Sequence, residues 1–185
     1  MEAHKLKNID DLMEALKKDE RLELINGEIV KRPMARFEHG QVQGNLREEL
    51  GELRRHGNSG GWWFATEVSV KYNEHQMPCH DIAGWRKERV VQKPSGVVSI
   101  APDWVCEIVS PGHISRDTVK ILNILKDNQV PYYWIIDPEE KALTVYQFVE
   151  DGYKVIASIQ EQSKIRLEPF PEIEFDLGYI FGETE

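Results

Sequence analysis

A short apolar run with one acid inside it constrains the fold of this chain most. Residues 103–111 read Asp-Trp-Val-Cys-Glu-Ile-Val-Ser-Pro, and Pro102 closes the run on its other side. Such a run predicts a buried strand. A buried carboxylate is costly unless it is paired or holds a metal, so Glu107 needs an explanation. Asp81 has a similar setting within residues 79–85. Two acids carried by strands indicate a metal site.

The pattern around Glu107 predicts a β-α-β unit. A helix is expected at about residues 115–128 and a strand at 132–136, so the strands on either side of the helix should run parallel. The other expected elements are helices at 8–18 and 38–56, the second capped by Gly57, an Asn26-Gly27 hairpin at 22–32, and strands at 62–72, 79–86, 142–149, 153–159 and 172–175. This order predicts an α/β fold, a mixed β-sheet flanked by helices with an N-terminal hairpin and C-terminal strands.

Composition indicates one domain, residues 1–185, with a real core, because 41% of the residues are hydrophobic. The net charge of -9 means that a DNA partner would need a local basic face. No apolar stretch approaches the roughly 18 residues of a membrane span, and the first residues do not resemble a signal peptide. Cys79 and Cys106 do not form a disulfide framework. We therefore expect a cytoplasmic protein with no membrane partner.

The two acids suit a divalent metal. Asp81 and Glu107 lie on successive predicted strands, and paired carboxylates suit Mg²⁺ (or Mn²⁺), which keeps several of its waters. Such an ion can stabilise the transition state of phosphodiester cleavage and lower the pKa of an attacking water. The alternative is structural: Asp81 ends an edge strand in solvent, and Glu107 meets an arginine.

Two sets of basic residues could serve such a site. Lys120 lies on the helix that leaves the Glu107 strand and shares a helical face with Asp117, although a solvated ion pair explains that spacing equally well. Arg86, Lys87 and Arg89 follow Asp81 directly and are candidates for phosphate contacts, although a solvated surface loop is the default for such charges.

Several short segments, taken in order, resemble one known family. They are residues 22–28, Glu38-His39, 81–86, 102–111, 130–138 and 169–171. Together they resemble the Uma-two (Uma2) family of restriction-endonuclease-like proteins, which is placed in the PD-(D/E)XK nuclease superfamily. The resemblance runs from about residue 22 to residue 181.

The resemblance implies a restriction-endonuclease-like core with Asp81 as the first acidic metal ligand and Glu107 as the second. It also implies that the catalytic lysine has moved to the following helix, where Lys120 is the nearest match. A further acid near the start of the domain often completes such sites. Three residues are candidates for this role and are not ranked: Glu23, Glu28 and Glu38.

The chain departs from the family pattern at three places. His80 stands where the family usually has proline before the first acid. Asp103 does follow a proline, but only three residues separate it from Glu107, so it is not assigned as a ligand. The position of the family's helix lysine falls on Ile121, and Lys120 is one residue off, about 100° around the helix. A local shift of the helix could repair this. Otherwise the site lacks its lysine.

Two functions follow. The first is a Mg²⁺-dependent DNA endonuclease in which Asp81 and Glu107 hold the metal and Lys120 assists. The second is a catalytically inactive nuclease-fold protein that binds DNA or a protein partner, as a homodimer. The two acids favour the first function, while the misplaced lysine and the acidic net charge favour the second.

Overall fold

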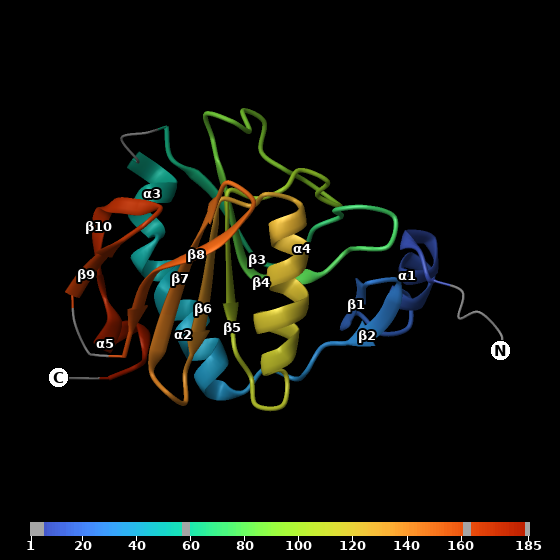
Figure 1. Cartoon of the computed structure of the whole chain (residues 1–185), viewed down its shortest axis with the longest axis horizontal. Helices are drawn as coiled ribbons and strands as arrows, with labels where there is room; N and C mark the ends of the chain where they lie inside the picture. Colours follow the sequence, from blue (N-terminus) through green and yellow to red (C-terminus); the bar gives the residue numbers. More distant parts are fainter. Residues whose placement is uncertain (1–5, 57–59, 161–163, 184–185) are drawn as a thin grey trace.

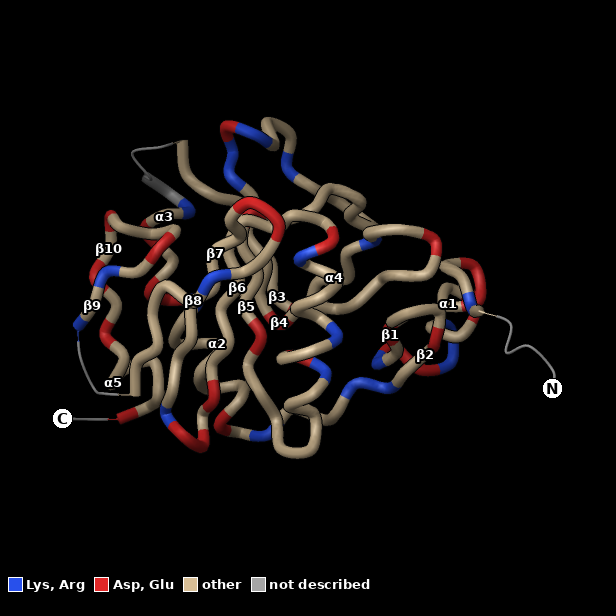
Figure 2. The backbone as a smooth tube through the Cα atoms, viewed as in Figure 1, with Lys and Arg blue, Asp and Glu red and all other residues tan. Residues whose placement is uncertain are grey.

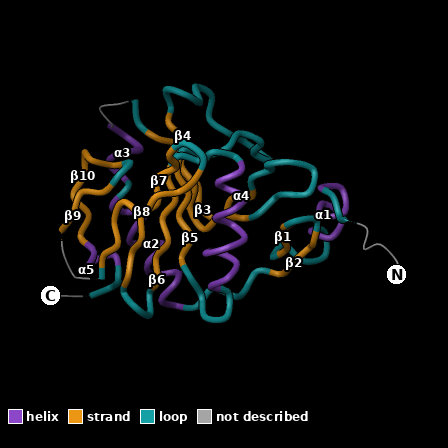
Figure 3. The backbone as a smooth tube through the Cα atoms, viewed as in Figure 1, coloured by secondary structure: helices purple, strands orange, loops and turns teal. Residues whose placement is uncertain are grey.

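The computed structural model describes residues 6–56, 60–160 and 164–183, and a six-stranded mixed sheet lies at its centre (Figure 1). The strands, in spatial order, are β3 (Trp62–Ser69), β4 (Cys79–Arg86), β5 (Trp104–Ile108), β6 (Tyr132–Asp137), β7 (Ala142–Val149) and β8 (Gly152–Ile159). The β5–β6 pair is parallel, and the other four pairs are antiparallel. Figure 3 shows these strands gathered between the helices.

The predicted β-α-β unit is present. The connection from β5 to β6 begins as a π-helix, η1 (Arg116–Ile121), and continues as the α-helix α4 (Leu122–Asp127). Parallel strands need a long crossover of this kind, and β5 and β6 pair in parallel as expected. A π-helix was not expected, and such turns are frequent at functional sites.

One face of the sheet packs against α2 (Phe37–Glu49) and the C-terminal elements. The remaining elements on this face are α3 (Gly51–His56), β9 (Lys164–Leu167), β10 (Phe170–Asp176) and α5 (Leu177–Ile180). Trp104, Trp134 and Phe170 are fully buried there, and their rings meet edge to face. Gly84 is required in this layer, because a Cβ atom would lie 2.8 Å from the ring of Phe64.

The opposite face of the sheet packs against η1, α4 and the loop at residues 87–101. Ala83 on β4 and Val105 on β5 are buried there with Ile121 and Leu125. Successive side chains of a strand point to opposite faces, so Ala83 and Trp85 of β4 share this face with Val105 of β5. Nearer the start of β4, Asp81 contacts His39 of α2, and its neighbour His80 contacts Glu107.

The N-terminal hairpin lies outside the main sheet, beside α1 (Ile9–Leu16) (Figure 1). Its arms are β1 (Leu22–Ile25) and β2 (Glu28–Lys31). Asn26 and Gly27, at the predicted hairpin turn, both have positive φ, 53° and 72°, as a type I′ turn requires.

Most of the predicted elements are confirmed, with differences at their ends. The expected helix at 38–56 is divided at Leu50 into α2 and α3, and the expected strand at 62–72 ends at Ser69. The prediction missed β9 and the single-turn α5, which are too short to show periodicity. Gly57, the expected cap, lies outside the described residues. No helix in the described part of the chain is long and apolar enough to cross a membrane.

Candidate active site

Asp81 and Glu107 are carried by neighbouring interior strands. The antiparallel register of β4 and β5 pairs Ile82 with Cys106, so Asp81 and Glu107 each lie one residue beyond the paired stretch. Since β4 lies between β3 and β5, the alternative that Asp81 ends an edge strand is wrong. The two carboxyl groups have different neighbours: Asp81 contacts His39 of α2, whereas Glu107 contacts His80 and Arg116.

Asp81 is buried but keeps one oxygen without a hydrogen bond from the described residues. Its Oδ2 accepts from the Ile108 backbone N–H at 2.7 Å and lies 3.2 Å from His39 Nε2. Its Oδ1 lies 3.8 Å from Arg32 Nη2, beyond hydrogen-bond distance. Burial alone would raise the pKa of this carboxyl, but the His39 hydrogen bond and charge, with the Ile108 N–H, hold it below its usual value. Asp81 is therefore ionised at neutral pH.

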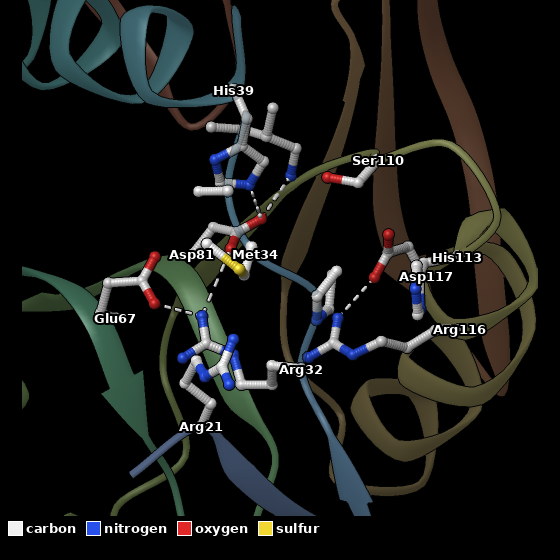
Figure 4. A pocket seen from close by; sticks show the side chains of 13 residues that line it. Arg21, Arg32, Met34, His39, Glu67, Asp81, Ser110, His113, Arg116 and Asp117 are labelled. Carbon is white, nitrogen blue, oxygen red and sulfur yellow. Dashed lines mark hydrogen bonds and ion pairs between the residues drawn. The ribbon is translucent and has the colours of Figure 1, made fainter. Parts of the chain in front are cut away.

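Asp81 lies at the wall of a pocket of about 480 Å³ (Figure 4). The connector from β2 to α2 forms one side of the pocket, and the segment after β5 forms another. The lining residues are Arg21, Arg32, Pro33, Met34, Ala35, His39, Glu67, Asp81, Ile108, Ser110, His113, Arg116 and Asp117. Three arginines and two histidines line this pocket together with three acids, so its charges are mixed.

His39 contributes to the positive charge of this pocket. Burial lowers the pKa of its ring, but the hydrogen bond to Asp81 and the charges of Asp81 and Glu67 more than offset this, and the pKa is raised. The raised pKa favours the protonated ring, whose Nε2 lies 3.2 Å from Asp81 Oδ2. His39 belonged to the segments of the family resemblance but was not predicted as a site residue.

Glu107, by contrast, is fully buried and does not line the pocket. Its Oε1 lies 2.6 Å from His80 Nδ1, and its Oε2 accepts from Arg116 Nη1 at 3.1 Å. Burial, opposed by Arg116 and reinforced by the charges of Asp81 and Glu23, raises its pKa to about 8. The structural alternative, that Glu107 meets an arginine, is what the structure shows.

His80 is the other side chain that contacts the Glu107 carboxyl group. Burial and the nearby Arg116 lower the pKa of its ring to about 3, so the imidazole is neutral at physiological pH. A neutral ring has one N–H and one acceptor nitrogen, and its tautomer decides which of the two faces Glu107. The other nitrogen, Nε2, lies 2.9 Å from the hydroxyl oxygen of Tyr72. His80 is thus part of the support for Glu107.

Arg116 is the centre of the closed network. A guanidinium has five N–H donors, and all five of Arg116 have acceptors. Nε and Nη2 donate to the two oxygens of Glu23 at 2.6 and 2.7 Å, and Nη2 also donates to the Cys79 carbonyl at 3.0 Å. Nη1 donates to Glu107 and to Asp117. Arg116 therefore has no donor left for a substrate.

Comparison with known proteins places this chain in a family. The family model described as "Putative restriction endonuclease", Uma2, matches residues 9–178. The chain belongs to the Uma2 family. A search of curated proteins found no match. A solved structure described as "a putative nuclease belonging to DUF820", from Anabaena variabilis ATCC 29413, is similar with a TM-score of 0.77 and 20% identity. The match covers 94% of this chain and 97% of that one, and it shows a shared fold.

Lys120 does not take the place of the Uma2 lysine. Its side chain is exposed and lies outside the residues that line the pocket. The family position falls on Ile121, which is fully buried in the apolar core. The π-helix changes the local register without turning Lys120 inward, and Asp117 pairs with Arg116 instead.

Arg116 could have been suspected from sequence. The helix predicted at 115–128 carries three basic residues: Arg116, Lys120 and Lys126. A buried Glu107 demands a cation, and Arg116 is the first of the three after the strand. Lys120 was predicted instead, because it is the nearest match to the family's lysine.

Of the three candidate acids for completing the Uma2 site, the structure brings one into the network. Glu23 is buried and binds Arg116 with both oxygens, and its Oε2 also accepts from the Cys79 backbone N–H at 3.0 Å. Glu28 and Glu38 are exposed. Asp117, which the sequence analysis did not consider as a site acid, also joins the network.

The expected phosphate contacts are placed away from the pocket. Arg86 ends β4, five residues and therefore roughly 17 Å along the strand from Asp81. Lys87 Nζ donates to the Arg54 carbonyl at 2.9 Å, and Arg89 donates to Asp103 at 2.8 Å. Lys87 also lies over the ring of a tryptophan, and Arg86 over that of another. The structure therefore does not bring these residues to Asp81.

The arrangement accepts a divalent ion at one acid more readily than at both. Mg²⁺ is bound in proteins by one or two carboxylates plus waters and substrate phosphates, and Asp81 Oδ1 is available as such a ligand. Both oxygens of Glu107 already have partners, so it would have to exchange Arg116 for the ion. The described residues contain no cluster of three or more potential metal ligands.

Proposed function

We propose that this chain binds the phosphodiester backbone of DNA in the pocket around Asp81 and hydrolyses it with Mg²⁺ or Mn²⁺ as cofactor. Membership of the Uma2 family and the nuclease-like fold support this proposal. The observation that carries it is an ionised acid with one free oxygen in a pocket with three arginines and two histidines.

Arg32 is the residue best suited to contact phosphate. Its side chain is 17% exposed at the pocket, and one of its five donors bonds to Glu67 in the described structure, which leaves donors for a ligand. Arg21 lines the same pocket, and the protonated ring of His39 adds a further charge. Arginine contacts of this kind give DNA binding its affinity and its dependence on salt.

Asp81 would hold the ion through Oδ1, and Glu107 would be the second ligand after releasing Arg116. When bound, the ion would polarise the phosphate and lower the pKa of an attacking water. With Lys120 turned outward, Arg32 and the protonated His39 are the cations placed to stabilise negative charge on the phosphate beside Asp81.

Cleavage of supercoiled plasmid with Mg²⁺ or Mn²⁺ tests the proposal. We expect wild-type protein to nick or linearise the plasmid and Asp81→Asn to lose this activity, because the variant keeps the shape of the side chain and removes its charge. Asp103→Asn is the matched control, since Asp103 is a buried acid next to β5 that pairs with Arg89 outside the pocket. Cleavage that persists in Asp81→Asn would overturn the proposal.

A second function is favoured by a specific observation. Ile121 stands at the family's lysine position, and Arg116 donates a hydrogen bond to the second acid, Glu107. These features suit a nuclease-fold module that binds DNA or a protein partner without cutting, as a homodimer. Wild-type protein that binds DNA but leaves it intact with both metals would establish this function. Light scattering of the purified protein would test the dimer.

A further inference from the structure

The connector between the hairpin and α2 combines positive charge with exposed apolar side chains. Residues 31–37 read Lys-Arg-Pro-Met-Ala-Arg-Phe, with three basic residues and no acid in a chain of net charge -9. Met34 is 76% exposed and Phe37 is 78% exposed. Arg32, Met34 and their neighbours line the pocket around Asp81. Figure 2 shows this basic stretch at the bottom of the view, away from the basic loop after β4 at the top.

Single exposed apolar residues are common on protein surfaces, so they indicate a binding site only when their position supports one. Four of the five tryptophans, Trp62, Trp85, Trp104 and Trp134, are each at most 1% exposed, whereas Phe37 is 78% exposed. Phe37 is the first residue of α2, two residues before His39. Met34 is at the wall of the pocket itself, and Phe37 does not line it. An exposed aromatic side chain therefore stands at the end of the connector, outside the pocket where Asp81 would meet a phosphate.

The connector also follows a second hollow. A smaller cavity of about 200 Å³ shares His39 and Ser110 with the main pocket and is lined by Arg36. Arg36 forms an ion pair with Glu139 at 3.5 Å, but both side chains are more than half exposed, and such pairs are weak. Glu38 also lines this hollow. Arg32 thus lines the main pocket, Arg36 lines the smaller hollow, and His39 lines both.

We propose that the connector selects single-stranded or locally unpaired DNA, with Phe37 stacking on an unpaired base while Arg32 and Arg36 contact the phosphates that flank it. This inference rests on the proposed function, because it supplies the form of DNA that enters the pocket. Charge complementarity favours a nucleic acid over a protein partner. In a duplex the face of each base is covered by its neighbours, so an aromatic side chain gains a stacking partner only where a base is unstacked.

Fluorescence anisotropy tests the inference with a labelled thymidine 20-mer and a duplex of the same length, both without divalent metal. Wild-type protein should prefer the single strand. Phe37→Ala should lower the ratio of single-strand to duplex affinity by roughly tenfold, since stacking on an aromatic ring is a large part of single-strand binding. Phe37→Leu should fall between the two. Val91→Ala is the matched control, because Val91 is 79% exposed in the loop after β4 and lies outside the pocket.

The outcomes separate this inference from the proposed function. Arg32→Ala should weaken binding of both forms of DNA. If it does so while Phe37→Ala behaves like Val91→Ala, the selection of unpaired DNA is overturned and the proposed phosphate pocket stands. If wild-type protein binds neither form, the proposed function itself is overturned. A thermal melt of each variant confirms that these exposed substitutions leave the fold intact.

Discussion

The two acids of the site lie on neighbouring strands, and their surroundings differ. Asp81 borders a pocket, with one oxygen held by His39 and a backbone N–H and the other free of hydrogen bonds from the described residues. Glu107 is enclosed, with one oxygen on His80 and the other on Arg116. We call these the open half and the closed half of the site.

The difference shows that burial alone does not determine the pKa of a carboxyl group or its availability to a ligand. Both acids are less than 10% exposed. Their pKa values nevertheless move in opposite directions, because His39 stabilises the charge on Asp81, while Glu107 is more deeply enclosed and is repelled by Asp81 and Glu23. The open half is therefore suited to a ligand, and the closed half joins β1, β4, β5 and η1 through Arg116.

The largest expected effect comes from the cation of the closed half. Arg116→Met should lower the free energy of unfolding by about 3–5 kcal/mol, because it leaves buried acids without their counter-charge. Arg32→Met, in the open half, should cost only about 1 kcal/mol. Urea unfolding monitored by tryptophan fluorescence measures both. Equal losses would mean that the two halves do not differ in structural importance.

The closed half should also make stability depend on pH. The pKa values of Glu107 and Asp117 are raised to about 8, chiefly by burial and, for Asp117, by the charge of Glu107. An acid with a raised pKa keeps in the folded state a proton that the unfolded chain releases, so stability falls as pH rises from about 5 to about 8. The fall should reach several kcal/mol, because each unit by which a pKa is raised corresponds to about 1.4 kcal/mol.

Glu107→Gln tests this assignment. The variant cannot titrate at this position, so its stability should fall less steeply over the same pH range than that of the wild type. The comparison matters because His39, whose pKa is also raised, loses its contribution as pH rises and acts in the same direction. Identical slopes for wild type and variant would show that Glu107 is not protonated in the folded protein.

Local patterns were enough to predict much of the fold. The Asn26-Gly27 turn, the apolar run around Glu107 and the β-α-β order each depend on residues close in sequence, and each is present in the structure. The closed half could not be predicted in this way. Arg116 meets Glu23 across 93 residues, and a pattern read along the chain contains no record of such a contact.

The lack of long-range information in a sequence pattern also explains why two groups of basic residues, predicted to serve the site, lie outside the pocket. Arg86, Lys87 and Arg89 were chosen because they follow Asp81 in sequence, but a strand carries its two ends apart, and they meet other partners. Lys120 was predicted as the nearest match to the family's helix lysine, but the segment is a π-helix that buries Asp117 and Ile121 and leaves Lys120 exposed. The connector at residues 31–37 was not predicted as part of the site, because its position beside the pocket depends on the folded chain.

The smallest expected effect is at Lys120. Because its side chain is exposed and outside the pocket, Lys120→Ala should change stability by less than about 0.5 kcal/mol and leave DNA cleavage unchanged. A plasmid assay beside Arg32→Ala, which should weaken cleavage, makes the comparison. Loss of cleavage in a folded Lys120→Ala protein would mean that η1 turns when DNA binds and restores the family's lysine.

Calorimetric titration of Mn²⁺ into wild type, Asp81→Asn and Glu107→Gln tests the division into open and closed halves most directly. We predict one ion for each wild-type chain, loss of binding in Asp81→Asn, and weaker but measurable binding in Glu107→Gln, because Asp81 offers a free oxygen while Glu107 must first release Arg116. Binding that survives in Asp81→Asn and disappears in Glu107→Gln would place the ion in the closed half and contradict this account.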